Sequence, residues 1–227
     1  MRMNRSKDDT GLLPFPRMNW GGRRKGAGRK PKGDRAGVSH RSRAALASRF
    51  PVHVTTRLVR GLPSLRSQGV YAVLRAAFAK GCEGNGFRLV HYSVQGNHLH
   101  MIVEANDRSC LSRGMQGLLV RIARALNRLW RRAGKVFADR YHDHILRTPR
   151  EVRHALAYVL NNARRHGVRL AQEIDWFTSG CWFDGWREKL TNRVASELAR
   201  PVARARNWLL NVGWRRHGLI GHQEVPG

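Results

Sequence analysis

The sequence is poor in cysteine and has no long apolar run. The cysteines Cys82, Cys110 and Cys181 are widely spaced, and none belongs to a Cys-x-x-Cys pair. This spacing favours neither a disulfide framework nor a zinc ribbon, and it fits a reducing compartment. No uninterrupted apolar stretch approaches the roughly 18 residues of a membrane span, and no apolar core of a signal peptide follows the basic N-terminus. We therefore expect a cytoplasmic protein.

Acidic residues are also scarce, which leaves a very large positive charge. The 227-residue chain has 43 lysines and arginines against 15 aspartates and glutamates, a formal net charge of +28 at pH 7. Such a charge repels itself in a compact fold, and a polyanion neutralises it because each phosphate contact releases condensed counterions. We expect nucleic acid as the partner rather than an anionic membrane surface.

Basic residues occur throughout the chain, but the first 49 residues differ from the rest in lacking the pattern of a folded domain. Residues 1–49 combine Lys and Arg with Gly, Pro and Ser and show little hydrophobic periodicity, which predicts a disordered, DNA-contacting arm. Residues 22–33 loosely resemble an AT-hook without its Arg-Gly-Arg-Pro core, and a flexible tail with nonspecific phosphate affinity is the preferred alternative. The DNA contacts expected in this arm are Arg23, Arg24, Lys25, Arg29 and Lys30.

Beyond residue 49 the hydrophobic pattern becomes that of a folded domain. Alternation and helical spacing predict the order β-α-β-β-α-β-α, an α+β fold with helices packed on an antiparallel sheet. We place the folded domain at residues 50–185 and a basic, Trp-containing extension at 186–227. The expected strands cover 52–58, 87–94, 98–104 and a β-like stretch over 136–146, and the expected helices cover 71–80, 111–132 and 150–166.

Two histidines on one predicted strand are the first candidates for chemistry. Side chains two residues apart project from the same face of a strand, so His98 and His100 present their imidazoles side by side while Leu99 and Met101 point into the core. This arrangement suits a metal ion. A strand face with two solvated histidines is the alternative.

A tyrosine on the last predicted helix is the second candidate. Tyr158 and Asn162 are four residues apart and share one helix face, on which Arg165 follows one turn after Asn162. A tyrosine packed in the core is the alternative. Three neighbouring residues are weaker candidates: Tyr141, flanked by two histidines, as another nucleophile or ligand; Glu104 as a carboxylate that orients an imidazole or forms a surface salt bridge; and His154 as a metal or DNA contact.

Three segments together resemble a known family. Residues 95–103 (QGNHLHMIV), 136–142 (VFADRYH) and 158–162 (YVLNN) are similar to the single-tyrosine HUH transposases, and particularly to the REP-associated tyrosine transposases of bacteria. The resemblance covers roughly residues 50–185. It departs from the family at Ala163, where many relatives have proline. The Tyr-to-Asn spacing is unaffected by this departure.

The resemblance implies a fold and an activity. The fold would be a ferredoxin-like antiparallel sheet with packed helices. His98, His100 and Asn162 would bind Mg²⁺ or Mn²⁺, and Tyr158 would be the nucleophile that cuts single-stranded, hairpin-forming DNA and retains it as a 5′-phosphotyrosine. The family includes monomers and homodimers, and the sequence does not choose between them.

Other functions fit parts of the same pattern. A noncatalytic DNA-binding protein derived from such an enzyme and an unrelated RNA-binding module both remain as alternatives, whereas a replication initiator would need further domains for which 227 residues leave no room. In either DNA-binding case we expect the basic helix faces to contact phosphates, through Arg121, Arg124, Arg128, Arg164 and Arg165.

Overall fold

The computed structural model describes residues 43–165, 167–168, 170, 172–190 and 199–225. The predicted DNA contacts at Arg23, Arg24, Lys25, Arg29 and Lys30 lie outside these residues. None of the described helices is long and apolar enough to cross a membrane.

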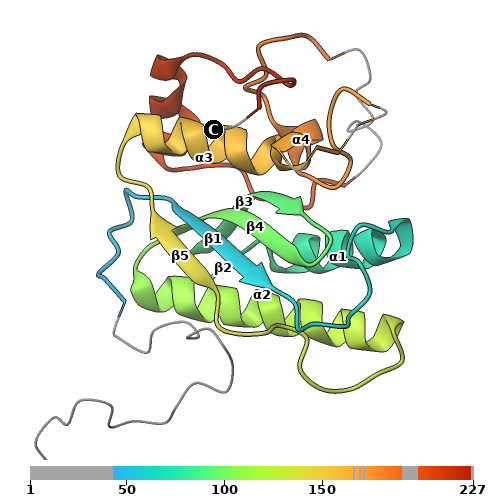
Figure 1. Cartoon of the computed structure of the whole chain (residues 1–227). Helices are drawn as coiled ribbons and strands as arrows, with labels where there is room; N and C mark the ends of the chain where they lie inside the picture. The colour runs from blue at the N-terminus through green and yellow to red at the C-terminus, as the bar shows by residue number, and fades with distance from the viewer. Residues whose placement is uncertain (1–42, 166, 169, 171, 191–198, 226–227) are drawn as a thin grey trace, which may run out of the picture. The chain divides into compact units, whose positions relative to one another are not determined.

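A five-stranded antiparallel sheet forms the centre of the described domain. Its strand order is β2-β3-β4-β1-β5, and every pair of neighbours is antiparallel. Figure 1 shows this sheet between two layers of helices. The structure therefore confirms the predicted α+β class and the order of the predicted elements, and it adds a short strand, β2. The strands are β1 (Val52–Arg57), β2 (Glu83–Gly84), β3 (Phe87–Val94), β4 (His98–Ala105) and β5 (His142–Ile145).

The helices α1 (Gln68–Gly81) and α2 (Arg108–Leu129) cover one face of the sheet. Both begin at a residue whose side chain accepts a hydrogen bond from the first turn, Ser67 for α1 and Asp107 for α2. Their apolar stripes pack on the alternate residues of β1 and β4 that point toward them, which include Val54, Leu99 and Met101. This is the larger of the two cores.

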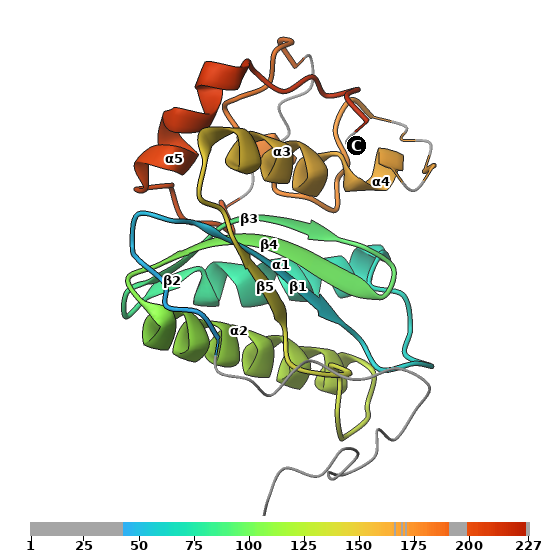
Figure 2. The ribbon, with the colours of Figure 1, turned by 60° about the vertical axis from the view of Figure 1, so that its left-hand side comes forward.

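The opposite face of the sheet lies against α3 (Pro149–Leu160), as Figure 2 shows. This helix begins with a capping box, in which Thr148 and Glu151 bond each other's backbone N–H groups. The prediction of one continuous helix over 150–166 is wrong, because the chain leaves helical geometry at Asn161 and resumes in α4 (Asn162–Arg165). The Asn161 side chain donates instead to the carbonyl of Gly221, 2.9 Å away.

The C-terminal segment packs on α3 and completes the second core. It contains the 3₁₀ turn η1 (Gly180–Trp182), the helix α5 (Trp208–Asn211) and the 3₁₀ turn η3 (Gly213–His217). Trp214 is 1% exposed and packs with Phe183 beside the apolar residues of α3. The tryptophans of this region thus hold the helix that carries Tyr158.

The domain's packing also extends back before residue 50. Leu46 is buried in the larger core, and the Arg43 guanidinium lies over the Tyr141 ring and pairs with Asp143. Residues 43–49, which the sequence pattern assigns to the basic arm, therefore contact the folded domain.

Glu104 links the C-terminal segment to the sheet. Its carboxylate is 2% exposed, accepts a hydrogen bond from Arg88 at 2.8 Å, and accepts further bonds from the backbone N–H groups of Arg206 and Asn207. A buried carboxylate is tolerated when several donors surround it, as they do here. Glu104 therefore anchors the C-terminal segment to the sheet. The sequence led us to expect either a contact with an imidazole or a surface salt bridge, and Glu104 forms neither.

Replacing Glu104 by alanine is expected to lower the free energy of unfolding by about 3 kcal/mol or more, because Arg88 and two backbone donors lose their buried acceptor. Urea unfolding followed by circular dichroism measures the change. Glu83→Ala is the matched control, since half-exposed Glu83 also contacts Arg88 and Arg206, and it should cost no more than about 1 kcal/mol. Equal losses in the two variants would contradict the anchoring role.

Candidate active site

The two histidines of β4 lie on the sheet face that α3 covers. Leu99 and Met101 point into the larger core, so the intervening His98 and His100 point the other way, as the alternation predicts. His100 is 5% exposed and His98 is half-buried. Their rings are 4.9 Å apart and nearly perpendicular.

The neighbouring strand β1 adds side chains that the sequence pattern did not single out. Thr55 lies directly opposite His100 in the ladder, and Arg57 lies opposite His98. His53 stacks on His100, with ring centroids 5.4 Å apart. The alternation of residues 52–57 places His53, Thr55 and Arg57 on one face, and this is the signal that could have identified them.

Hydrogen bonds orient both β4 imidazoles through the same ring nitrogen. Nδ1 of His98 is 2.8 Å from the Asn97 side-chain oxygen. Nδ1 of His100 is 3.1 Å from the Thr55 hydroxyl and 3.3 Å from Nε2 of His53. When Nδ1 carries the proton and donates, Nε2 carries the lone pair, which is the tautomer that a metal-binding histidine needs.

The tyrosine of α3 reaches this group within the same chain. The Tyr158 ring meets His100 edge-on, with centroids 5.1 Å apart, and meets His53 with centroids 5.7 Å apart. Tyr158 is half-buried, and the Arg165 guanidinium lies 5.2 Å from its ring centroid. The phenol therefore faces the histidines of the sheet, and the alternative of a tyrosine packed only among apolar residues does not describe it.

Asn162 is the most unusual polar residue near this helix. It is fully buried, and neither its amide oxygen nor its amide nitrogen has a hydrogen-bond partner among the described residues. An unsatisfied buried amide costs roughly 1–3 kcal/mol, so such residues call for an explanation. An amide oxygen is one of the ligand types that a divalent cation accepts. Within the part of the chain that the structure describes, no group of three or more His, Cys, Asp or Glu side chains is placed to hold a metal ion, at this site or at any other.

His53 is neutral at ordinary pH. Burial, and to a smaller extent electrostatic repulsion from nearby His144, lowers the pKa of His53 from 6.5 to about 4. His144 lies opposite His53 across the β1–β5 ladder. A neutral His53 can share a hydrogen bond with His100 without adding positive charge to the site.

The weaker candidates lie in different surroundings. Tyr141 belongs to the larger core with α2, on the other side of the sheet from His98 and His100, and burial raises the pKa of its phenol. It is therefore poorly placed to act with these histidines. His154 is exposed one turn before Tyr158.

The arginines predicted to bind DNA lie in different parts of the structure. Arg121, Arg124 and Arg128 belong to α2, in the helical layer on the far side of the sheet from Tyr158. Arg164 donates to the backbone carbonyls of His222 and Glu173, which gives it a structural role. Arg165 contacts a candidate catalytic residue, Tyr158.

Two histidines on a central strand that face a tyrosine on a packed helix are the arrangement that the resemblance to the HUH transposases implies. Residues 49–162 match the model of the IS200-like transposases, and since this is half of the 227-residue chain, the protein belongs to that family. The suspected resemblance is thereby confirmed. No curated protein matches the sequence.

The fold is also similar to a solved structure, that of a REP-associated tyrosine transposase bound to a REP hairpin. The TM-score is 0.52 and the identity 19%, over 63% of this chain and 82% of that chain. At this identity the likeness concerns the fold.

The state of Asn162 leads to a stability prediction. Asn162→Leu should raise the free energy of unfolding, by about 1 kcal/mol or more, because it removes two unsatisfied buried polar atoms at similar volume. Asn161→Leu is the matched control and should lower it by about 1–3 kcal/mol, because it strands the Gly221 carbonyl. Thermal and urea unfolding without added metal measure both, and a destabilised Asn162→Leu would show that the amide is satisfied after all.

Proposed function

We propose that this transposase cuts and rejoins single-stranded DNA by transesterification on Tyr158. The observation that supports this most directly is the contact between Tyr158 and His100 in one chain, with ring centroids 5.1 Å apart. A tyrosine buried for packing alone needs no polar face of three histidines and a threonine beneath it. This chemistry distinguishes the proposal from a noncatalytic DNA-binding protein built on the same fold.

A divalent cation, Mg²⁺ or Mn²⁺, fits the site. His98 and His100 would bind it through Nε2, and Asn162 through its amide oxygen, which is otherwise unsatisfied among the described residues. When bound, the ion would polarise the scissile phosphate and stabilise the charge on the leaving oxygen.

The chain's own residues supply the nucleophile and the surrounding positive charge. The Tyr158 phenol loses its proton and its oxygen forms a bond to phosphorus, while the bond from phosphorus to the 3′ oxygen breaks and that oxygen takes up a proton as a free 3′-OH. The DNA is then held as a 5′-phosphotyrosine, so rejoining needs no ATP. Arg57, which pairs with His98 in the β1–β4 ladder, and Arg165, beside the Tyr158 ring, would bind phosphate oxygens near the reacting group.

The proposed substrate is single-stranded DNA next to a hairpin. The net charge of +28 supports a polyanionic partner, and the similar solved structure is described as bound to a REP hairpin. Because one chain brings Tyr158 to its own histidines, we propose cleavage in cis, which either a monomer or a homodimer could perform.

The first test is the covalent intermediate. Purified protein incubated with Mg²⁺ or Mn²⁺ and end-labelled single-stranded DNA carrying the hairpins that flank its own gene should give a band on a denaturing gel that contains both protein and DNA. Tyr158→Phe should abolish this band, because the ring is kept and only the nucleophilic oxygen is lost. Tyr141→Phe is the matched control and should retain the band.

Each outcome of this test has a clear meaning. An adduct that needs metal and Tyr158 supports the proposal. An adduct lost in Tyr141→Phe but kept in Tyr158→Phe would assign the nucleophile to the other tyrosine. Tight binding of the flanking hairpins with no adduct under either metal would identify a noncatalytic DNA-binding protein.

The hydrogen bond between Thr55 and His100 gives a second prediction. Thr55→Val should raise the Mn²⁺ concentration needed for half-maximal adduct formation by roughly 10–100-fold, because the imidazole loses a partner that fixes its tautomer. Thr56→Val is the control on the neighbouring residue: Thr56 points to the other face, and its buried hydroxyl has no partner among the described residues. If both valine variants respond equally to Mn²⁺, Thr55 does not position His100.

A further inference from the structure

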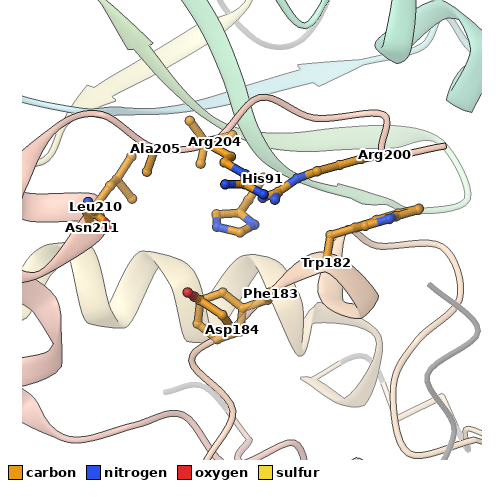
Figure 3. A pocket seen from close by; sticks show the side chains of 10 residues that line it. His91, Trp182, Phe183, Asp184, Arg200, Arg204, Ala205, Leu210 and Asn211 are labelled. Carbon is orange, nitrogen blue, oxygen red and sulfur yellow. The ribbon is translucent and has the colours of Figure 1, made fainter. Parts of the chain in front are cut away.

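A second basic site lies beside β3, outside the group around Tyr158. It is a pocket of about 500 Å³ between β3, the residues around η1 and the C-terminal segment that leads into α5. Figure 3 shows the Arg200 and Arg204 side chains reaching toward the ring of His91, with Trp182 and Phe183 on the adjoining wall. No step proposed for the cleavage reaction uses these residues.

Among the residues that the structure describes, the positive charge of this pocket has no direct carboxylate partner. Among the described residues, neither Arg200 nor Arg204 forms an ion pair, and the carboxylate of Asp184 in the same wall pairs with Arg215 at 2.8 Å. Burial, together with the positive charge of Arg204, lowers the pKa of Arg200. Two guanidinium groups held near each other without a carboxylate form a site that an anion would stabilise.

The other walls are uncharged and partly aromatic. His91 is held by a hydrogen bond between its Nδ1 and the Ser179 hydroxyl, and burial lowers the pKa of His91 to about 3, so it stays neutral. Trp182 is half-buried, and its indole N–H has no acceptor in the described part of the chain. Arginines beside an aromatic ring are the combination that binds single-stranded nucleic acids, the arginine contacting phosphate and the ring contacting a base.

The sheet register places this pocket close to the candidate active site and on the same face. Ser93 pairs with His100, and His91 is two residues further along β3, opposite Ile102. The β-bulge between Leu89 and His91 turns both Val90 and His91 toward the α3 face, where each contacts the second core. His91 and His100 lie on adjacent strands and are offset by two residues. Standard strand geometry therefore puts their Cα atoms about 8 Å apart.

We propose that this pocket binds one nucleotide of the DNA strand away from the cleaved phosphate. Arg200 and Arg204 hold its phosphate, and Trp182 faces its base. A volume of about 500 Å³ is within the range of small-ligand pockets and accommodates one nucleotide. The proposal rests on the DNA substrate of the proposed function, but it does not depend on covalent chemistry.

The test is a binding measurement in which no cleavage can occur. Tyr158→Phe protein in EDTA is titrated against a fluorescein-labelled oligonucleotide that carries one flanking hairpin and its single-stranded extension, and anisotropy is recorded at several salt concentrations. Introducing Arg200→Ala and Arg204→Ala together into the Tyr158→Phe protein should weaken oligonucleotide binding about tenfold. The slope of log K against log salt should fall by about 0.7, as for one phosphate of a single strand.

Two further variants keep the result interpretable. Lys80→Ala with Arg113→Ala removes the same charge from exposed positions on the α1–α2 layer, and should change the affinity less than twofold. Asn211→Asp adds a negative charge to the pocket wall at constant size, and should weaken binding as the arginine variant does.

An equal loss of DNA affinity in the pocket and control variants would mean that the arginines act only through the protein's overall charge, and would overturn the proposal. Unchanged affinity in both pocket variants would overturn it as well. Because the assay needs neither metal nor Tyr158, a failure to form the covalent adduct would leave its outcome readable.

Discussion

The alternation of side chains along β4 is the constraint on which the rest of the structure depends. Leu99, Met101 and Val103 fill the core under α1 and α2, so the residues between them must face α3. This one strand therefore supplies the two candidate metal ligands near its start and the Glu104 anchor near its end. A slip of one residue in the β1–β4 register would turn the histidines into the core and also release the C-terminal segment.

The candidate site departs from the rule that buried polar groups are satisfied, and it does so most clearly at Asn162. Nδ1 of His98 and Nδ1 of His100 each have a hydrogen-bond partner, whereas the Asn162 amide is buried without one among the described residues. Its neighbour Asn161 is also buried but bonds Gly221, so the fold can satisfy an amide at this break in the helix. The contrast is what the proposed ligand role of Asn162 requires, since functional sites commonly retain groups at a cost to stability.

Much of the fold and of the candidate site could be predicted from sequence, because hydrophobic periodicity determines both elements and faces. The strands over 87–94 and 98–104, the side-by-side histidines and the helix with Tyr158 all follow from periods of two and 3.6 residues. The break at Asn161 could not be predicted, because it depends on a carbonyl 60 residues away in the chain. The prediction for Glu104 was wrong for the same reason: its partners in the C-terminal segment are distant in sequence and carry no local pattern.

The C-terminal segment is more than an addition to the family's domain. The family match ends at residue 162, just after the tyrosine, yet the position of α3 depends on residues beyond that point. Arg153 pairs with Glu224 at 2.7 Å, and Arg164 donates to the His222 carbonyl. These contacts hold the tyrosine helix and its continuation in α4 from the outer side, while the histidines approach from the sheet. Since a reacting group misplaced by about 1 Å can lose roughly 100-fold in rate, residues far from Tyr158 should influence its proposed reaction through these contacts.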